Sequence, residues 1–133
     1  MVEYKVLIAD DDEGIRKLAG EMVIRLAKKI GFEVDISLVN DRANLESACD
    51  ESVDLVITDV DMGNGNDGFL ATHYLRAKYP NLAIGVMSGH ASEREAIEAG
   101  ANYFVGKPFR LNDLKEKLLI PFYNSQDSLR HTT

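Results

Sequence analysis

The chain alternates short apolar runs with stretches of helical periodicity, and this alternation restricts its fold more than any other feature. The apolar runs predict five β-strands, at residues 5–9, 33–39, 54–58, 83–88 and 103–106. Helical spacing and capping signals predict helices near 15–30, 42–50, 68–79, 92–99 and 111–120. Because the connections are short, we predict a doubly wound α/β fold: a five-stranded parallel sheet flanked by five helices on both faces.

The 133 residues are enough for one domain with a substantial core. We find no repeat, long linker or low-complexity block, so a single domain is predicted over residues 1–120, without an output module. The last helix is predicted to end before Pro121, because proline interrupts helices. Residues 121–133, which include "NSQDSLRHTT", are predicted to form a disordered tail.

Charge and composition exclude several functional classes. The net charge of −7 argues against direct nucleic-acid binding. No apolar run approaches the roughly 20 residues of a membrane span, and the acidic start does not resemble a signal peptide. The single cysteine, Cys49, has the helical spacing of a core residue. A chain without a possible internal disulfide favours a reducing compartment, so we expect a cytoplasmic protein.

Polar residues with related chemistry follow four of the predicted strands. In an open parallel sheet, ligands bind beyond the carboxyl ends of the strands, and these ends converge on one edge. The residues found there are Asp10, Asp11 and Asp12 after the first strand, Asp59 and Asp61 after the third, Ser88 after the fourth and Lys107-Pro108 after the fifth.

Electrostatics indicates what such a group of residues would hold. Two carboxylates about 5 Å apart, at an effective dielectric near 20, repel each other by roughly 3 kcal/mol. Asp10, Asp11 and Asp59 would therefore need protons or a cation, and their oxygen ligands suit Mg²⁺. A serine hydroxyl and a lysine ammonium can bind phosphoryl oxygens. These residues together predict a phosphoryl site in which Asp59 is the nucleophile.

Each residue also has a purely structural interpretation. The "DDD" run could cap a helix, Asp59 could begin a turn, Lys107 could be a solvated charge and Ser88 a strand-end hydroxyl. The combination of four strand ends with matching chemistry favours the functional interpretation.

On these residues the sequence resembles the response regulator receiver domain of the CheY-like superfamily. The resemblance rests on "VLIADDDEGIRKL", "DLVITDVDM" followed by "DGFLA", "IGVMSGHA" and "GANYFVGKPF", and it covers residues 3–119. It implies a parallel sheet with the strand order 2-1-3-4-5.

The resemblance also implies a role for each site residue. Asp59 would accept a phosphoryl group from a sensor histidine kinase or phosphotransfer protein. Mg²⁺ would bind to Asp10, Asp11, Asp59 and the backbone carbonyl of Asp61. Lys107 would pair with the acid and its phosphate, and Pro108 would follow a cis peptide bond. Ser88 would move to the phosphoryl group while Phe104 rotates inward.

The expected readout is a changed surface on the fourth helix, fifth strand and fifth helix, which would regulate a downstream protein. Formation of a homodimer stays open. Such a protein catalyses only its own phosphorylation and dephosphorylation, and we do not expect an enzyme that acts on other substrates.

The chain departs from the family pattern near the site. "GNGN" follows Met62, where the family usually has a proline, and makes the loop one residue longer. Gly89 replaces the usual alanine after the switch residue. Asp61 and His90 lie close in sequence to the phosphorylation and switch positions. We therefore expect an atypical acyl-phosphate lifetime.

Two other functions stay open at this point. "DVD" at 59–61 resembles the first motif of haloacid-dehalogenase-like phosphatases, although their acidic metal pair follows the lysine, whereas here it precedes it. A receiver-like interaction module that works without phosphorylation is the second alternative.

Overall fold

All five predicted strands are present in the computed structural model, which describes residues 2–131. They are β1 (Glu3–Ala9), β2 (Glu33–Val39), β3 (Leu55–Asp59), β4 (Ala83–Ser88) and β5 (Tyr103–Gly106). All pairs are parallel, and the strand order is β2-β1-β3-β4-β5. The predicted fold class and strand order are confirmed.

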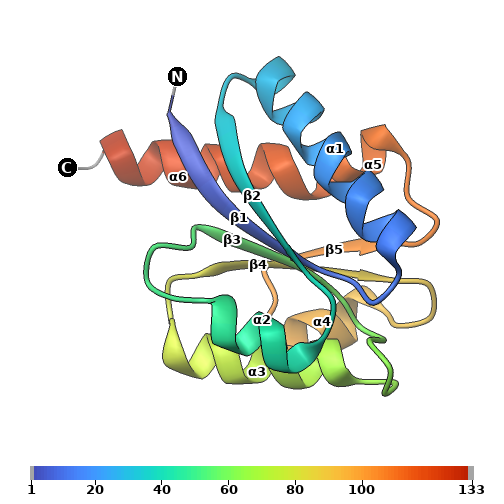
Figure 1. Cartoon of the computed structure of the whole chain (residues 1–133). Coiled ribbons are helices and arrows are strands. Elements are labelled where there is room, and N and C mark those ends of the chain that lie inside the picture. The colour runs from blue at the N-terminus through green and yellow to red at the C-terminus, as the bar shows by residue number, and fades with distance from the viewer. Residues whose placement is uncertain (1, 132–133) are drawn as a thin grey trace.

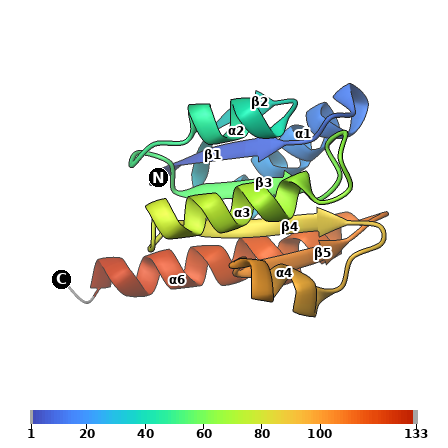
Figure 2. The same ribbon diagram turned by 90° about the horizontal axis from the view of Figure 1, so that it is seen from below.

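Helices cover both faces of the sheet (Figure 1). On one face lie α1 (Glu13–Ile30) and a carboxyl-terminal helical segment made of α5 (Leu111–Leu114), η1 (Lys115–Leu119) and α6 (Ile120–His131). The other face carries α2 (Arg42–Ala48), α3 (Asp67–Lys78) and α4 (Glu93–Ala99), which Figure 2 shows in front of the sheet. The fold is thus a three-layer sandwich with one core on each side of the sheet.

Local signals in the sequence explain where several helices begin and end. The Asp12 carboxylate caps α1 by accepting a hydrogen bond from the Ile15 backbone N–H, and Gly31 ends this helix with a φ of 123°. The predicted capping box of α4 is present between Ser92 and Glu95. Asp12, one of the three acids in "DDD", therefore caps a helix.

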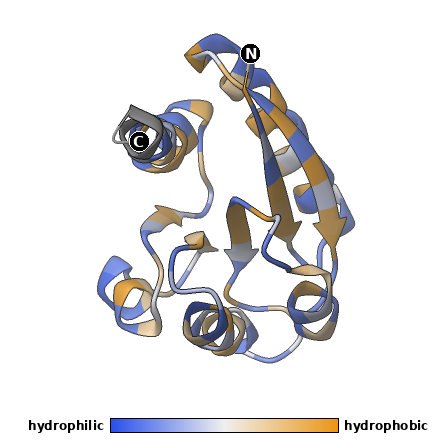
Figure 3. Ribbon diagram, turned by 90° about the vertical axis from the view of Figure 1, so that its left-hand side faces the viewer, coloured by the Kyte–Doolittle hydropathy of each residue, from blue (hydrophilic) through white to orange (hydrophobic). Residues whose placement is uncertain are grey.

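Burial follows the position of each strand in the sheet. Every residue of β3 and β4 is buried, whereas the exposed pattern of β2 fits its place at the edge. The helices in Figure 3 show both hydrophobic and hydrophilic residues, as expected for elements with one face on a core and the other in solvent. Cys49 is buried, as predicted, and burial raises the pKa of its thiol to about 11.

The prediction that the last helix ends before Pro121 is wrong. Residues Lys115–Leu119 form a π-helical turn, and α6 continues from Ile120 to His131. In this turn the N–H of Ile120 bonds to the carbonyl of Lys115, five residues earlier. A π turn is wider than an α turn, so it can accommodate a proline ring that would clash in a regular helix.

The disordered tail is consequently not found over residues 121–131, and residues 132–133 lie outside the described part of the chain. The predicted domain boundary at 120 falls inside continuous helical backbone. The helix is held by an aromatic cluster, which consists of Tyr4, Phe32, Phe122 and Tyr123. The Phe122 ring lies 5.3 Å from that of Tyr4, and the Tyr123 ring stacks on Phe32 at 4.9 Å.

Over residues 2–131, none of the helices combines the length and the apolar character that crossing a membrane requires.

Candidate functional site at the acidic edge of the sheet

Three carboxylates meet at the carboxyl edge of the sheet. One oxygen each from Asp10, Asp11 and Asp59 lies within 4.8 Å of the others. Asp10 follows β1 and is fully buried, Asp59 ends β3 and is 7% exposed, and Asp11 faces solvent. The structure thus brings together the three acids that the strand ends predicted.

Lys107 joins two of these acids. Its ammonium lies 2.8 Å from Oδ2 of Asp10 and 3.2 Å from Oδ1 of Asp59. Burial by itself would lower the pKa of Lys107, but the hydrogen bond to Asp10 and the attraction of both carboxylates raise this pKa overall. Lys107 therefore stays protonated at neutral pH and offers a fixed positive charge beside Asp59. The peptide bond between Lys107 and Pro108 is cis, as expected.

Asp10 uses both of its carboxylate oxygens within the protein. Oδ1 accepts a hydrogen bond from the Asp12 backbone N–H at 2.9 Å, and Oδ2 accepts one from Lys107. Asp11 and Asp59 are therefore better placed than Asp10 for direct contact with a metal ion. All three supply the hard oxygen ligands that suit Mg²⁺.

Arg16 supports the turn that carries Asp10, a role that the sequence analysis missed. Its guanidinium donates a hydrogen bond of 2.8 Å to the backbone carbonyl of Asp10. Arg16 lies one turn into α1, on the face toward the sheet edge. A helical arginine of this kind is common on protein surfaces, so the sequence alone offered no specific signal.

The environment of Asp59 disfavours its charged form. Burial raises the pKa of the Asp59 carboxyl, Lys107 opposes this rise, and the nearby Asp10 adds to it, so that the pKa stays above its ordinary value. A bound cation would relieve this unfavourable charge, which agrees with the prediction made from the strand ends.

The loop after β3 brings Asp61 to the site. The backbone N–H of Asp61 faces the Asp59 carboxylate and lowers its pKa, against the effect of burial, while the Asp61 residue is exposed. Gly63 has a φ of 103°, a conformation that favours glycine. The use of the Asp61 carbonyl as a metal ligand stays a prediction.

Gly68 at the start of α3 lets the helix approach the strand that ends on Asp59. Its backbone N–H bonds to the carbonyl of Val60 at 2.8 Å. A Cβ atom at position 68 would lie only 2.0 Å from the Asp59 backbone oxygen. The "DG" pair at residues 67–68 is part of the resemblance to the family, but only the tertiary structure shows its steric role.

Ser88 and Phe104, the predicted switch residues, lie on the neighbouring strands β4 and β5, where Phe104 pairs with Val86, two residues before Ser88. Ser88 is buried at the end of β4, and its hydroxyl contacts residues of the following loop. Phe104 on β5 is half-buried and packs against the core on the α3 side. It also lines a hollow of about 320 Å³ together with Glu93, Asn102, Tyr103 and Lys117. Their movement on phosphorylation stays a prediction.

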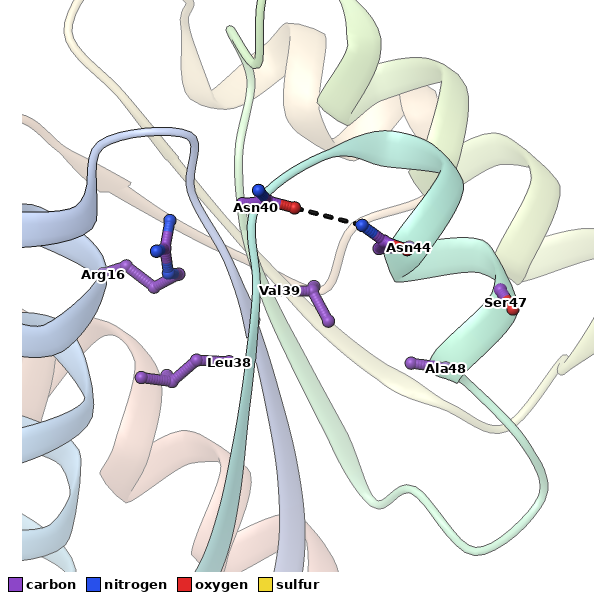
Figure 4. A pocket seen from close by; sticks show the side chains of 7 residues that line it. All are labelled: Arg16, Leu38, Val39, Asn40, Asn44, Ser47 and Ala48. Atoms are coloured by element: carbon purple, nitrogen blue, oxygen red, sulfur yellow. Dashed lines mark hydrogen bonds between the residues drawn. The ribbon is translucent and has the colours of Figure 1, made fainter.

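A separate groove of about 350 Å³ lies across the edge strand β2. Figure 4 shows Arg16 and Leu38 on its α1 side and Asn44, Ser47 and Ala48 on its α2 side. Asn44 donates a hydrogen bond of 3.1 Å to Asn40 within it. None of the three clustered carboxylates lines this groove, so the chemistry of the site does not extend into it.

Comparisons with known proteins agree with this geometry. The family model described as "Response regulator receiver domain" matches residues 6–119. The response regulator FleR of Pseudomonas aeruginosa is 29% identical over 113 residues, which are 83% of this chain and 23% of FleR. An NtrX-like response regulator of Rickettsia typhi is 30% identical over 124 residues, which are 90% of this chain and 24% of that protein. The chain thus spans about a quarter of the length of these relatives.

A solved structure of a receiver domain from Clostridium thermocellum superposes with a TM-score of 0.73. The match covers 98% of this chain and 99% of the other, at 23% sequence identity. At that sequence identity, the structural likeness supports the fold alone. The assignment of the chain to a family rests on the match to the family model.

Proposed function

Because the chain belongs to the response regulator receiver domain family, we propose that Asp59 accepts a phosphoryl group from a phosphohistidine. The donor would be a sensor histidine kinase or a phosphotransfer protein in the cytoplasm. The observation that carries this proposal is the convergence of Asp10, Asp11 and Asp59 within 4.8 Å, with the ammonium of Lys107 bonded to two of them.

In the proposed reaction, a carboxylate oxygen of Asp59 attacks the phosphorus atom. The P–N bond of the phosphohistidine breaks, and the imidazole leaves with the electron pair and takes up a proton. Lys107 lies close enough to Asp59 to attract an oxygen of the incoming phosphoryl group. It also keeps Asp10 in place through a direct hydrogen bond.

Asp11 and Asp59 would bind a Mg²⁺ ion directly, and the Asp61 carbonyl would be a further ligand. Asp10 would lie next to the ion without a direct bond to it. When bound, the ion would neutralise the crowded carboxylates and the charge on the phosphoryl oxygens. The donor set fits this ion because it consists of oxygen atoms, and two of the three carboxylates are buried.

Phosphorylation adds about −1.5 to −2 charges and new hydrogen-bond acceptors beside Ser88. We infer that the Ser88 hydroxyl then turns to the phosphoryl group and that Phe104 moves inward. The surface of α4, β5 and the carboxyl-terminal helical segment would change as a result, since Phe104 and Lys117 line the same hollow there. A downstream protein would recognise this change.

Incubation with acetyl phosphate and Mg²⁺, followed by intact-protein and peptide mass spectrometry, tests the proposal. We expect one phosphoryl group on Asp59, loss of the label in Asp59→Asn, and loss of labelling in the presence of a chelator. Asp61→Asn is the matched control, because it removes a nearby carboxylate and keeps the backbone carbonyl. Size-exclusion chromatography of the labelled sample would show whether a homodimer forms.

Other outcomes of this experiment would identify the alternatives. Rapid turnover of external phosphate esters without a stable label would indicate a phosphatase, which the family match does not favour. A folded protein that acquires no label would indicate an interaction module that works without phosphorylation.

A further inference from the structure

The Ser88 hydroxyl has three hydrogen-bond neighbours, all in the loop after β4. Its oxygen accepts hydrogen bonds from the backbone N–H groups of His90, at 3.1 Å, and Ala91, at 2.8 Å. The third neighbour is Nδ1 of the His90 imidazole, at 3.1 Å. The side chain of His90 therefore contacts the residue to which the proposed function assigns the switch.

Counting donors and acceptors gives the direction of the third hydrogen bond. A hydroxyl group has two lone pairs and one proton. The two backbone N–H groups occupy both lone pairs of Ser88. The hydroxyl can then only donate to His90, so Nδ1 must lack a proton and the neutral ring must carry its proton on Nε2.

We propose that His90 is a positioning residue that holds the Ser88 hydroxyl in its resting orientation. The inference rests on the proposed function, in which the Ser88 hydroxyl donates a hydrogen bond to an oxygen of the phosphoryl group on Asp59. One proton cannot serve both acceptors, so His90 and the phosphoryl group compete for it. The bond to His90 must break when the switch operates, and its loss opposes activation.

The surroundings of His90 allow this role to be tested without unfolding the protein. The residue is exposed, whereas Ser88 is 2% exposed. Among the described residues, Ser88 is the hydrogen-bond partner of the His90 side chain. Replacing the imidazole should therefore release the Ser88 hydroxyl from its resting orientation and leave both hydrophobic cores intact.

Two variants of nearly equal shape separate the hydrogen bond from side-chain size. His90→Asn keeps an acceptor atom at the position of Nδ1, and His90→Leu replaces it with a methyl group. The probe is beryllofluoride with Mg²⁺, a non-covalent phosphoryl mimic, titrated while NMR signals near Asp59 are followed.

We expect beryllofluoride to bind His90→Leu roughly 2- to 10-fold more tightly than the wild type, as for the loss of one competing hydrogen bond. His90→Asn should bind it within about twofold of the wild type, because the acceptor is retained. Equal affinity in the Leu and Asn variants would overturn the proposal.

A second measurement reads the ring directly. In ¹⁵N NMR of the unmodified wild type, at a pH well above the ordinary histidine pKa, we expect Nδ1 without a proton and Nε2 with one. A proton on Nδ1 would overturn the proposal. If the wild type does not bind beryllofluoride, the proposed function fails, and the nitrogen spectrum still decides whether His90 accepts a hydrogen bond from the Ser88 hydroxyl.

Discussion

The two ends of the β-sheet differ in what they bury. At the carboxyl end, Asp10, Asp59 and Lys107 place charges in a largely enclosed site. At the amino end, Tyr4, Phe32 and Phe122 are fully buried, and their rings contact one another edge to face or at a tilt. We infer that the aromatic end supplies stability, whereas the acidic end gives up stability to keep reactive groups in place.

The pKa of Asp59 supports this interpretation. Burial raises the pKa of its carboxyl in the folded protein. A folded-state pKa above the unfolded value means that the folded protein binds the proton more tightly. The stabilisation from this group is therefore present at low pH and is lost as the pH rises through the folded pKa. At neutral pH the Asp59 carboxylate opposes folding unless a cation is bound.

The largest effect should come from the aromatic end. Phe122→Ala should lower the free energy of unfolding by about 3–5 kcal/mol, because it leaves a cavity among buried rings. Urea denaturation measures this change, and Phe122→Leu should give a smaller loss. Labelling of Asp59 should persist in the folded fraction of both variants. A change below about 1 kcal/mol would show that α6 does not contribute as this packing implies.

Gly68→Ala should have the next largest effect, at the junction of strand and site. The added Cβ would collide with the Asp59 backbone oxygen, so we expect a loss of about 1–3 kcal/mol in unfolding free energy. Labelling of Asp59 by acetyl phosphate should also become slower. Gly65→Ala is the matched control in the loop just before α3, where a Cβ would meet nothing within 4 Å. Equal effects of the two substitutions would remove the steric role of Gly68.

Asp59→Asn should have the smallest effect on stability, with the opposite sign. In Mg²⁺-free buffer at neutral pH, it should raise the free energy of unfolding by on the order of 1 kcal/mol. The gain from removing a buried carboxylate that Asp10 repels exceeds the loss of the ion pair between Asp59 and Lys107. Urea denaturation measures the gain, with the exposed Asp61→Asn as the control. Destabilisation by Asp59→Asn would contradict the contrast between the two ends of the sheet.

The strand ends made the acidic site predictable. Parallel strands place their carboxyl ends on one edge, so Asp10, Asp11, Asp59 and Lys107 had to come close once the order of elements was recognised. The residues that support these groups were harder to foresee. The hydrogen bond from Arg16 to the Asp10 carbonyl and the contact of Gly68 with Asp59 depend on distances between separate elements.

The carboxyl-terminal helical segment shows why a local rule failed. Pro121 indicates the end of a helix when only neighbouring residues are considered. In the folded protein, Phe122 is buried against Tyr4 and Phe32, residues about 90 or more positions earlier in the chain. The free energy gained from that burial favours continued helix, with a π turn before the proline.

The sequence by itself determined the order of strands and helices and the chemistry at the strand ends, because both depend on periodicity and on the identity of adjacent residues. Only the tertiary structure decided that α6 continues past Pro121 and that the Ser88 hydroxyl contacts Nδ1 of His90. The course of α6 depends on packing between distant segments, and the Ser88 contact depends on how the loop after β4 folds back on one atom, so the identity of neighbouring residues alone predicts neither feature.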